Sequence, residues 1–129
     1  MEPRIHRVVH LITGELCRDV PMAELAQAVN LSPSRLRHLF KDQTGLSLTQ
    51  YLKVQRMQKA KELLETTFLS VKEVMLRVGF KDKSNFSQAF KKLYGLSPVK
   101  YRSQYFERNE RDDEEDSQTS QPITIRANK

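Results

Sequence analysis

Residues 71–102 decide how this chain folds, and they read VKEVMLRVGFKDKSNFSQAFKKLYGLSPVKYR. Their pattern predicts a short helix, a sharp turn at Gly79, a second helix over Asp82–Tyr94 and a Ser-Pro start to a third helix. In the second helix, apolar residues recur at the i, i+3, i+4, i+7 spacing of one buried stripe, namely Phe86, Ala89, Phe90 and Leu93. Polar residues occupy the opposite side, namely Ser84, Ser87, Gln88 and Lys91. The stretch therefore has the layout of a helix-turn-helix motif.

The polar side of the second helix has the chemistry needed to contact DNA. Hydroxyl and amide groups can form hydrogen bonds with base edges in the major groove, and an ammonium group can pair with a backbone phosphate. For a single amphipathic helix, however, a solvated outer face is the ordinary explanation of such a pattern. The interpretation as a DNA-binding face depends on a second observation, which is that the pattern occurs twice.

A shift of fifty residues aligns the chain with itself. The core, turn and helix-end residues pair as Leu36 with Phe86, Phe40 with Phe90, Lys41 with Lys91, Gly45 with Gly95, Leu46 with Leu96, Ser47 with Ser97 and Tyr51 with Tyr101. With one residue of slack, Asn30 pairs with Gly79, and both residue types tolerate the positive φ of a sharp turn. The polar faces pair as Ser34 with Ser84, Arg37 with Ser87 and His38 with Gln88. The sequence therefore predicts an all-α protein with two tandem helix-turn-helix units.

Local signals set the expected boundaries of these units. A first helix is expected from Pro3 to about Cys17, because its apolar residues follow helical spacing. Ser32-Pro33 combines a hydroxyl N-cap with proline at the first helical position, and Ser70-Val-Lys-Glu73 is a capping box. Within a domain of residues 1–106, the further predicted elements are a first helix-turn-helix over about 21–45, a connecting helix over about 48–66, a second helix-turn-helix over about 70–95 and a last helix over about 97–106.

The connecting helix is predicted to be a rod that packs against a different unit at each end. Tyr51 and Leu52 share one flank of this helix, whereas Met57, Ala60 and Leu64 lie on another. About nineteen residues in a helix span roughly 28 Å, which is comparable to the roughly 34 Å between major-groove faces one turn apart. Two recognition helices could therefore enter successive grooves on one side of a duplex.

The charge of the chain favours a polyanionic partner. The 129 residues carry a net charge of +6 with a sequence pI near 9.6, and residues 1–106 hold 18 Lys and Arg against 9 Asp and Glu. Residues 107–129 include the run RDDEED and few apolar side chains, which is typical of a disordered acidic tail. No apolar run approaches the roughly 18 residues of a membrane span, and no signal peptide is recognisable, so we expect a cytoplasmic protein without a membrane partner.

No arrangement of residues favours catalysis or a cofactor. His6, His10 and Cys17 lie roughly in line on the first helix, and two imidazoles at i and i+4 could share a zinc ion. A full tetrahedral set is missing, however, so solvent-exposed histidines are the favoured explanation. Cys17 is the single cysteine, which excludes an intrachain disulfide. The sequence offers no paired carboxylates, no nucleophile with a base and no glycine-rich phosphate loop in a suitable setting, so we expect neither an enzyme nor a metal site.

The tandem units resemble the DNA-binding domain of the AraC/XylS family of bacterial transcription regulators. The resemblance covers about residues 5–106 and depends above all on Gly79-Phe80, Phe86, Phe90-Lys91, Gly95, Ser97-Pro98 and Tyr101-Arg102. It implies seven helices, with a long central helix between two helix-turn-helix units, and binding as a monomer to an asymmetric site near a promoter. Most members also carry a sensor domain, for which this chain has no room. The chain therefore resembles either the short stand-alone type or a domain cut from a longer protein.

The resemblance also implies which residues contact bases. By position these are Ser34, Arg35, Arg37 and His38 in the first unit and Ser84, Asn85, Ser87 and Gln88 in the second. A guanidinium can bind guanine through two hydrogen bonds, so Arg37 is the first candidate for a base contact, with a phosphate contact as its alternative. Many members carry arginine at the position of Gln88, so base contacts by the second unit are expected to be weaker or directed at adenine. The candidate phosphate contacts are Lys41, Lys53, Arg56, Lys83, Lys91, Lys100 and Arg102.

Two functions follow from these observations. The first is a sequence-specific transcription regulator, without catalysis, that binds double-stranded DNA with one recognition helix in each of two successive major grooves. The second is a protein-interaction module, for example one that contacts RNA polymerase, with secondary or non-specific DNA binding. The first function predicts binding that weakens steeply with salt, whereas the second predicts a retained protein partner without a DNA footprint.

Overall fold

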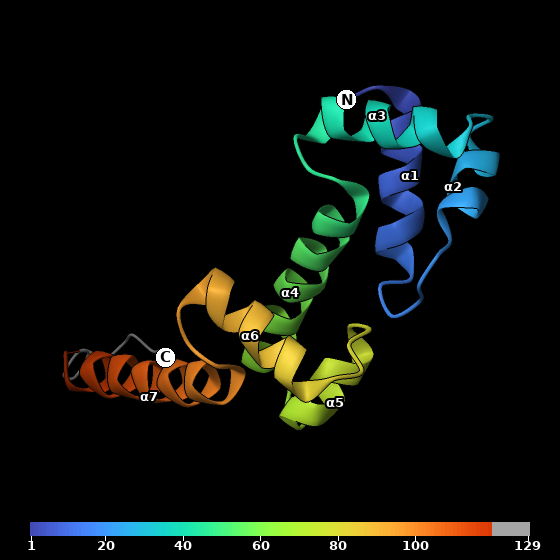
Figure 1. The fold of residues 1–129 in the computed structure, drawn as a ribbon. Helices are drawn as coiled ribbons and strands as arrows, with labels where there is room; N and C mark the ends of the chain where they lie inside the picture. The colour runs from blue at the N-terminus through green and yellow to red at the C-terminus, as the bar shows by residue number, and fades with distance from the viewer. Residues whose placement is uncertain (120–129) are drawn as a thin grey trace.

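The computed structural model describes residues 1–119, and it describes side chains for residues 1–110. Within this part the chain forms seven helices and no strand, in the order α1 (Pro3–Gly14), α2 (Met22–Ala28), α3 (Pro33–Thr44), α4 (Leu48–Thr66), α5 (Val71–Arg77), α6 (Lys83–Tyr94) and α7 (Pro98–Thr119). Figure 1 shows an elongated molecule in which α1–α3 gather at one end of α4 and α5–α7 at the other. The prediction of an all-α fold with two units on a long central helix is therefore confirmed.

The capping signals in the sequence form the expected hydrogen bonds. Ser47 Oγ accepts a hydrogen bond from Gln50 N, and the Gln50 side chain accepts one from Ser47 N, so α4 begins with a capping box. Ser70 and Glu73 make the same reciprocal pair at the start of α5, and the hydrogen bond from Ser70 N lowers the pKa of the Glu73 carboxyl. These bonds satisfy backbone groups that a helix N-terminus otherwise leaves unpaired, which fixes where both helices begin.

The first helix ends at Gly14 rather than near Cys17. Glycine inside a helix costs about 1 kcal/mol relative to alanine, and the chain turns directly after it. The Leu16 carbonyl oxygen then accepts a hydrogen bond from Arg56 Nε of α4 at 2.8 Å. The residues after Gly14 therefore form a loop against α4 instead of a further turn of α1.

Each unit has its own core, and α4 contributes to both. The first core consists of Ile5, Val8, Ile12, Leu25, Ala26, Val29, Leu36 and Phe40. Tyr51 and Leu52 of α4 pack against it while remaining partly exposed. The second core consists of Met57, Ala60, Leu64, Val74, Met75, Val78, Phe86 and Phe90. The predicted change of side along α4 is therefore confirmed, and apolar burial fixes this helix at both ends.

The buried stripe predicted along α6 needs one correction. Phe86 and Phe90 are fully buried, but 47% of Leu93 is exposed. Tyr94 packs against the second core in its place. The physical reason lies in α7, because Tyr101 places its ring 5.5 Å from that of Phe90 and 6.4 Å from that of Tyr94. The aromatic contacts between α6 and α7 thus recruit the neighbouring tyrosine rather than the leucine.

The last helix is longer than predicted. It continues to Thr119, so residues 107–119 are helical, whereas their composition predicts a disordered tail from residue 107. These residues include neither Gly nor Pro, and Glu, Arg and Gln have high helix propensities, so the local preference for helix outweighs the low apolar content. The remainder of the predicted tail, residues 120–129, lies outside the described residues.

Candidate nucleic-acid interface

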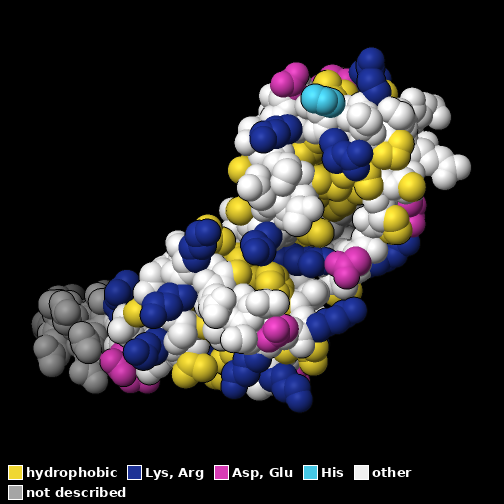
Figure 2. Space-filling model, viewed as in Figure 1, with side chains coloured by type: hydrophobic (Ala, Val, Ile, Leu, Met, Phe, Trp, Pro, Cys, Tyr) yellow, Lys and Arg dark blue, Asp and Glu magenta, His cyan; other side chains and the backbone are white. Residues whose placement is uncertain are grey.

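The recognition helices α3 and α6 present most of the predicted base contacts to solvent. The exposed ones are Ser34, Arg35, Arg37, His38, Ser84, Asn85 and Gln88, and Ser87 is half-buried. The apolar sides of both helices are held in the two cores, which fixes the direction in which the polar sides face. Figure 2 shows Lys and Arg side chains spread over both units on one face of the molecule. Both helices therefore expose hydrogen-bonding and cationic groups from rigid supports.

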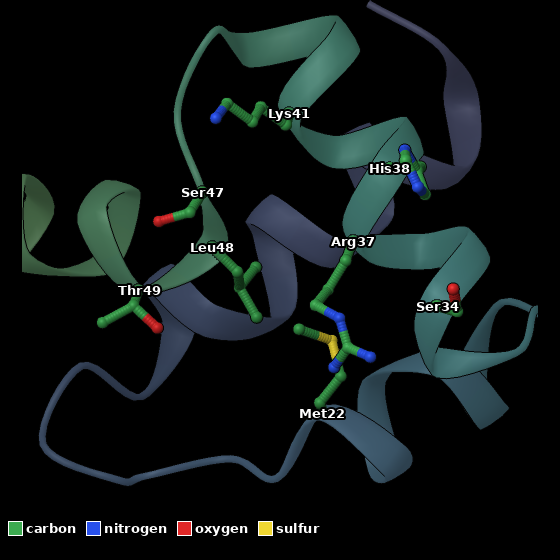
Figure 3. Close-up of a pocket in the computed structure, with 8 residues that line it drawn as sticks. All are labelled: Met22, Ser34, Arg37, His38, Lys41, Ser47, Leu48 and Thr49. Atoms are coloured by element: carbon green, nitrogen blue, oxygen red, sulfur yellow. The ribbon is translucent and has the colours of Figure 1, made fainter.

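A hollow of about 310 Å³ lies beside α3 in the first unit. Arg37 extends from α3 across this hollow, as Figure 3 shows. The other lining residues are Met22, Ser34, His38, Lys41, Ser47, Leu48 and Thr49. The structure thus brings together three of the four predicted base contacts of the first unit and one predicted phosphate contact, while Arg35 does not line the hollow.

The Arg37 guanidinium is available for an external partner. It forms no hydrogen bond or ion pair with the other side chains that the structure describes. Met22 and Leu48 supply an apolar lining near it, as Figure 3 shows. Its planar set of donors matches guanine O6 and N7 or two phosphate oxygens. Arg37 therefore has the geometry of a residue that binds an acceptor pair from outside the protein.

A larger groove of about 570 Å³ lies between the two units. Its lining consists of Asp19, Lys53, Arg56, Gly79, Phe80, Lys81, Asp82, Asn85, Gln88, Ala89 and Lys92. Two predicted base contacts of the second unit, Asn85 and Gln88, thereby share one groove with the predicted phosphate contact Lys53. The other predicted contacts of α6, which are Lys83, Ser84, Ser87 and Lys91, do not line it.

Sequence analysis missed two lysines of this groove, Lys81 and Lys92, and both are exposed. Lys92 follows Asn85 by seven residues and Gln88 by four, so helical spacing alone could have placed all three side chains on one face. Lys81 lies in the loop between the Gly79 turn and α6, where no periodic pattern operates. Only the fold brings Lys81 to the groove.

Arg56 is not a free phosphate contact, contrary to the prediction. Only 11% of its side chain is exposed. Its Nε donates to Leu16 O at 2.8 Å, and its Nη2 donates to Asp19 Oδ1 at 2.9 Å and to Arg18 O at 3.4 Å. The hydrogen bond from Arg56 lowers the pKa of the Asp19 carboxyl. Arg56 therefore joins α4 to the loop after α1, and its charge is already engaged.

Arg102 is also engaged within the protein, contrary to the prediction. Its Nε, Nη1 and Nη2 donate to the carbonyl oxygens of Leu64, Leu69 and Thr67 at 3.1, 2.5 and 3.3 Å respectively. Carbonyl groups at a helix C-terminus lack helical partners and carry partial negative charge. The guanidinium on α7 therefore caps the end of α4 and holds the loop that follows it, instead of facing DNA.

Replacing Arg102 with methionine is expected to lower the free energy of unfolding by about 1.5–3 kcal/mol, because the carbonyl groups lose a charged donor. The salt dependence of DNA binding should stay unchanged. The matched control is the exposed neighbour Lys100, whose replacement by methionine should leave stability within about 0.5 kcal/mol but reduce the slope of log affinity against log salt by about 0.9. Urea unfolding and DNA titrations at several salt concentrations measure both quantities. Weaker DNA binding by Arg102→Met at unchanged stability would contradict the assignment.

Lys61 is partly exposed, and its ammonium group interacts with side chains of the protein itself. Its Nζ lies 3.1 Å from Glu65 Oε2 and 5.9 Å from the ring centroids of Tyr94 and Tyr101. The hydrogen bond with Glu65 raises the pKa of Lys61. Burial, followed by the hydrogen bond that Tyr101 Oη donates to Glu65, raises the pKa of the Tyr101 phenol. The cluster therefore ties α4 to α6 and α7.

The described residues contain no group of three or more His, Cys, Asp or Glu side chains that could hold a metal ion. His6, His10 and Cys17 are exposed side chains of the first unit. Among the helices that the structure describes, none combines the length and the apolar character needed to cross a membrane.

Known proteins with similar sequences include operon regulators. Residues 25–104 match a family model described as a helix-turn-helix domain. The arabinose operon regulatory protein of Escherichia coli (strain K12) is 40% identical over 104 residues, which are 80% of this chain and 36% of that protein. The Msm operon regulatory protein of Streptococcus mutans is 36% identical over 100 residues, which are 78% of this chain and 36% of that protein. The chain thus spans about a third of the length of these relatives.

Solved structures of similar domains share this fold. The C-terminal domain of AraT, a response regulator from Geobacillus stearothermophilus, has a TM-score of 0.73 and 36% identity, over 80% of this chain and 86% of that chain. The DNA-binding domain of AdpA, in complex with a target DNA, has a TM-score of 0.76 and 31% identity, over 81% of this chain and 95% of that chain. The family model and these domains span both helix-turn-helix units. This chain therefore belongs to the AraC/XylS family of helix-turn-helix proteins.

Proposed function

We propose that this chain is the DNA-binding part of a sequence-specific transcription regulator and places α3 and α6 in successive major grooves of promoter DNA. One observation carries the proposal, which is that two recognition helices with exposed polar sides are anchored in separate cores at opposite ends of α4. The 19 residues of α4 span roughly 28 Å, close to the roughly 34 Å between groove faces one turn apart. The similar AdpA domain in complex with a target DNA supports DNA binding by this chain.

The proposed contacts divide into two chemical classes. Base contacts come from Ser34, Arg35, Arg37, His38, Ser84, Asn85, Ser87 and Gln88. Phosphate contacts come from exposed lysines, namely Lys41, Lys53, Lys83, Lys91 and Lys100, to which the groove adds Lys81 and Lys92. Both units lie in one chain, so the protein binds an asymmetric site as a monomer. The function requires no catalysis, and it operates in the cytoplasm, where bacterial promoters lie.

A protein contact, for example with RNA polymerase, is the second candidate function. One observation favours it, which is that Phe68, in the loop between α4 and α5, is 97% exposed. A single exposed aromatic residue is common on protein surfaces, however. A partner protein retained in a pull-down without any DNA footprint would favour this function over DNA recognition.

Selection of bound sequences from a random DNA pool tests the main proposal directly. The expected result is an enriched site with two conserved half-sites whose centres lie about 10 base pairs apart. Equal binding of all sequences at physiological salt would overturn the proposal, since an exposed basic face alone gives that behaviour.

Replacing Arg37 with alanine is expected to weaken binding to the selected site by about 1–3 kcal/mol and to relax the base preference at one position. The reason is that the guanidinium can pair with two acceptors of a single guanine. The matched control is Lys41→Ala on the same helix, which should weaken binding to all sequences alike. Repeating the selection with each variant provides the measurement, and an unchanged preference in Arg37→Ala would assign Arg37 to a phosphate instead.

A further inference from the structure

The two units meet beside α4, where the loop after α1 faces the turn after α5. Arg56 of α4 lies between them, and its hydrogen bonds to Leu16 O and Asp19 Oδ1 hold the loop of the first unit. On the other side, the turn at Gly79 packs against Leu16 O and the Arg56 guanidinium. A Cβ added at Gly79 would lie 2.8 Å from Leu16 O, 2.9 Å from Arg56 Cζ and 3.0 Å from Arg56 Nε. A side chain at Gly79 would therefore require the Leu16 loop or the Arg56 side chain to shift.

Both the contact and the backbone conformation favour glycine at position 79. Gly79 has a φ of +94°, and the matching turn of the first unit holds Asn30 with a φ of +56°. Asparagine therefore occupies the exposed turn of the first unit, where φ is positive but smaller than at Gly79. Gly45 and Gly95 also have positive φ, but an added Cβ would meet nothing within 4 Å at either position. Among the three glycines with positive φ, Gly79 alone is pressed against another part of the protein.

We propose that Arg56 is a positioning residue that locks the Gly79 turn of the second unit onto the Leu16 loop of the first. The lock adds a third point of attachment to the two cores at the ends of α4, so it fixes rotation of one unit about the axis of α4. The groove that holds Asn85 and Gln88 has Arg56 and Gly79 among its lining residues, so the lock lies directly beside the base contacts of the second unit. The lock therefore sets the half-site separation and helical phase that the protein accepts.

The inference rests on the proposed function, and its test compares DNA sites of different separation. The reference site is the one selected from the random pool, and the second site has one base pair inserted between the half-sites. One base pair rotates a half-site by about 35° and moves it by about 3.4 Å. The wild-type protein is expected to lose affinity by at least about tenfold on the second site, since base contacts of one unit are lost.

Arg56→Met keeps the aliphatic part of the side chain but removes its hydrogen bonds to Leu16 O and Asp19 Oδ1. Asp19→Asn removes the negative charge of the exposed carboxylate that accepts one of these hydrogen bonds. For Arg56→Met, the affinities for the two sites are expected to differ by less than about threefold. For Asp19→Asn, the difference is expected to lie between that of Arg56→Met and that of the wild-type protein. The matched control is Lys53→Met, an exposed lysine of the same helix and groove. It should weaken binding to both sites alike and preserve their ratio.

Gly79→Asn provides a second route to the same prediction, because the added side chain would collide with Leu16 O and Arg56 and would also strain a backbone with a φ of +94°. It should loosen the discrimination between the two sites as Arg56→Met does, whereas Asn30→Gly should leave it unchanged. Thermal unfolding identifies variants that fail to fold. If Arg56→Met fails to fold, Asp19→Asn still gives the ratio of affinities for the two sites, because Asp19 is exposed. A wild-type ratio in Arg56→Met and Asp19→Asn would overturn the lock. Absence of any sequence preference in the wild-type protein would instead overturn the proposed function.

Discussion

Replacing Phe90 with alanine is expected to lower the free energy of unfolding by about 3–5 kcal/mol, because a large buried ring leaves a cavity. Phe90 is completely buried, and its ring centroid lies 4.7 Å from that of Tyr94 and 5.5 Å from that of Tyr101. It thus joins α6 to α7 across the second core. Since the first core has its own residues, hydrogen exchange should accelerate in α5 and α6 more than in α2 and α3.

The control for this prediction is Phe68, which has the same side chain but is 97% exposed. Phe68→Ala should change stability by less than about 0.5 kcal/mol. Urea unfolding compares both variants with the wild-type protein. A similar loss for the two phenylalanines would contradict the assignment of separate buried and exposed roles, and uniform acceleration of exchange would contradict the division into two cores.

Raising the salt concentration from 50 to 200 mM is expected to weaken DNA binding by roughly 500- to 6,000-fold. The proposed contacts comprise five predicted lysines and two more from the groove between the units. Each neutralised phosphate contributes about −0.9 to the slope of log affinity against log salt, so the slope should lie between about −4.5 and −6.3. Affinities measured by titration at four or more salt concentrations give this slope directly.

The double variant Lys41→Gln and Lys91→Gln tests whether matching positions of the two units act alike. Each lysine lies in the last turn of its recognition helix and is exposed. The double variant should reduce the slope by about 1.8, with each single variant contributing half. A wild-type slope that is shallower than about −2 would refute the proposed phosphate contacts as a set.

Local sequence signals predicted the helices that they cap. The start of α4 at Leu48 follows from the Ser47 cap, and the end of α6 at Tyr94 follows from Gly95 in the left-handed conformation. The internal repeat then predicted the pairing of units, because it compares two copies under the same physical constraints. A helix depends mainly on residues that are close in sequence, and a repeat is found by comparing the chain with itself. Both can therefore be predicted from a single sequence.

The roles of Arg56 and Arg102 could not be predicted in this way. Both arginines lie on amphipathic helices at positions compatible with exposure, yet each donates to carbonyl oxygens 33 to 40 residues away. A helical period indicates which residues share a face but not which distant loop covers it. The contact between the units at Gly79 could not be predicted either, because a positive φ is already a sufficient explanation for glycine in a turn.

The division of α4 between two cores has a consequence for how the protein leaves its site. While one unit stays bound, α4 holds the other within reach of its half-site at a high effective concentration. Rebinding of the released unit then competes with dissociation of the whole protein. The lifetime of the complex therefore depends on the affinities of both units for their half-sites rather than on either affinity alone. A substitution that halves the affinity of one unit for its half-site therefore shortens the residence time of the whole chain on DNA, even when the other unit is unchanged.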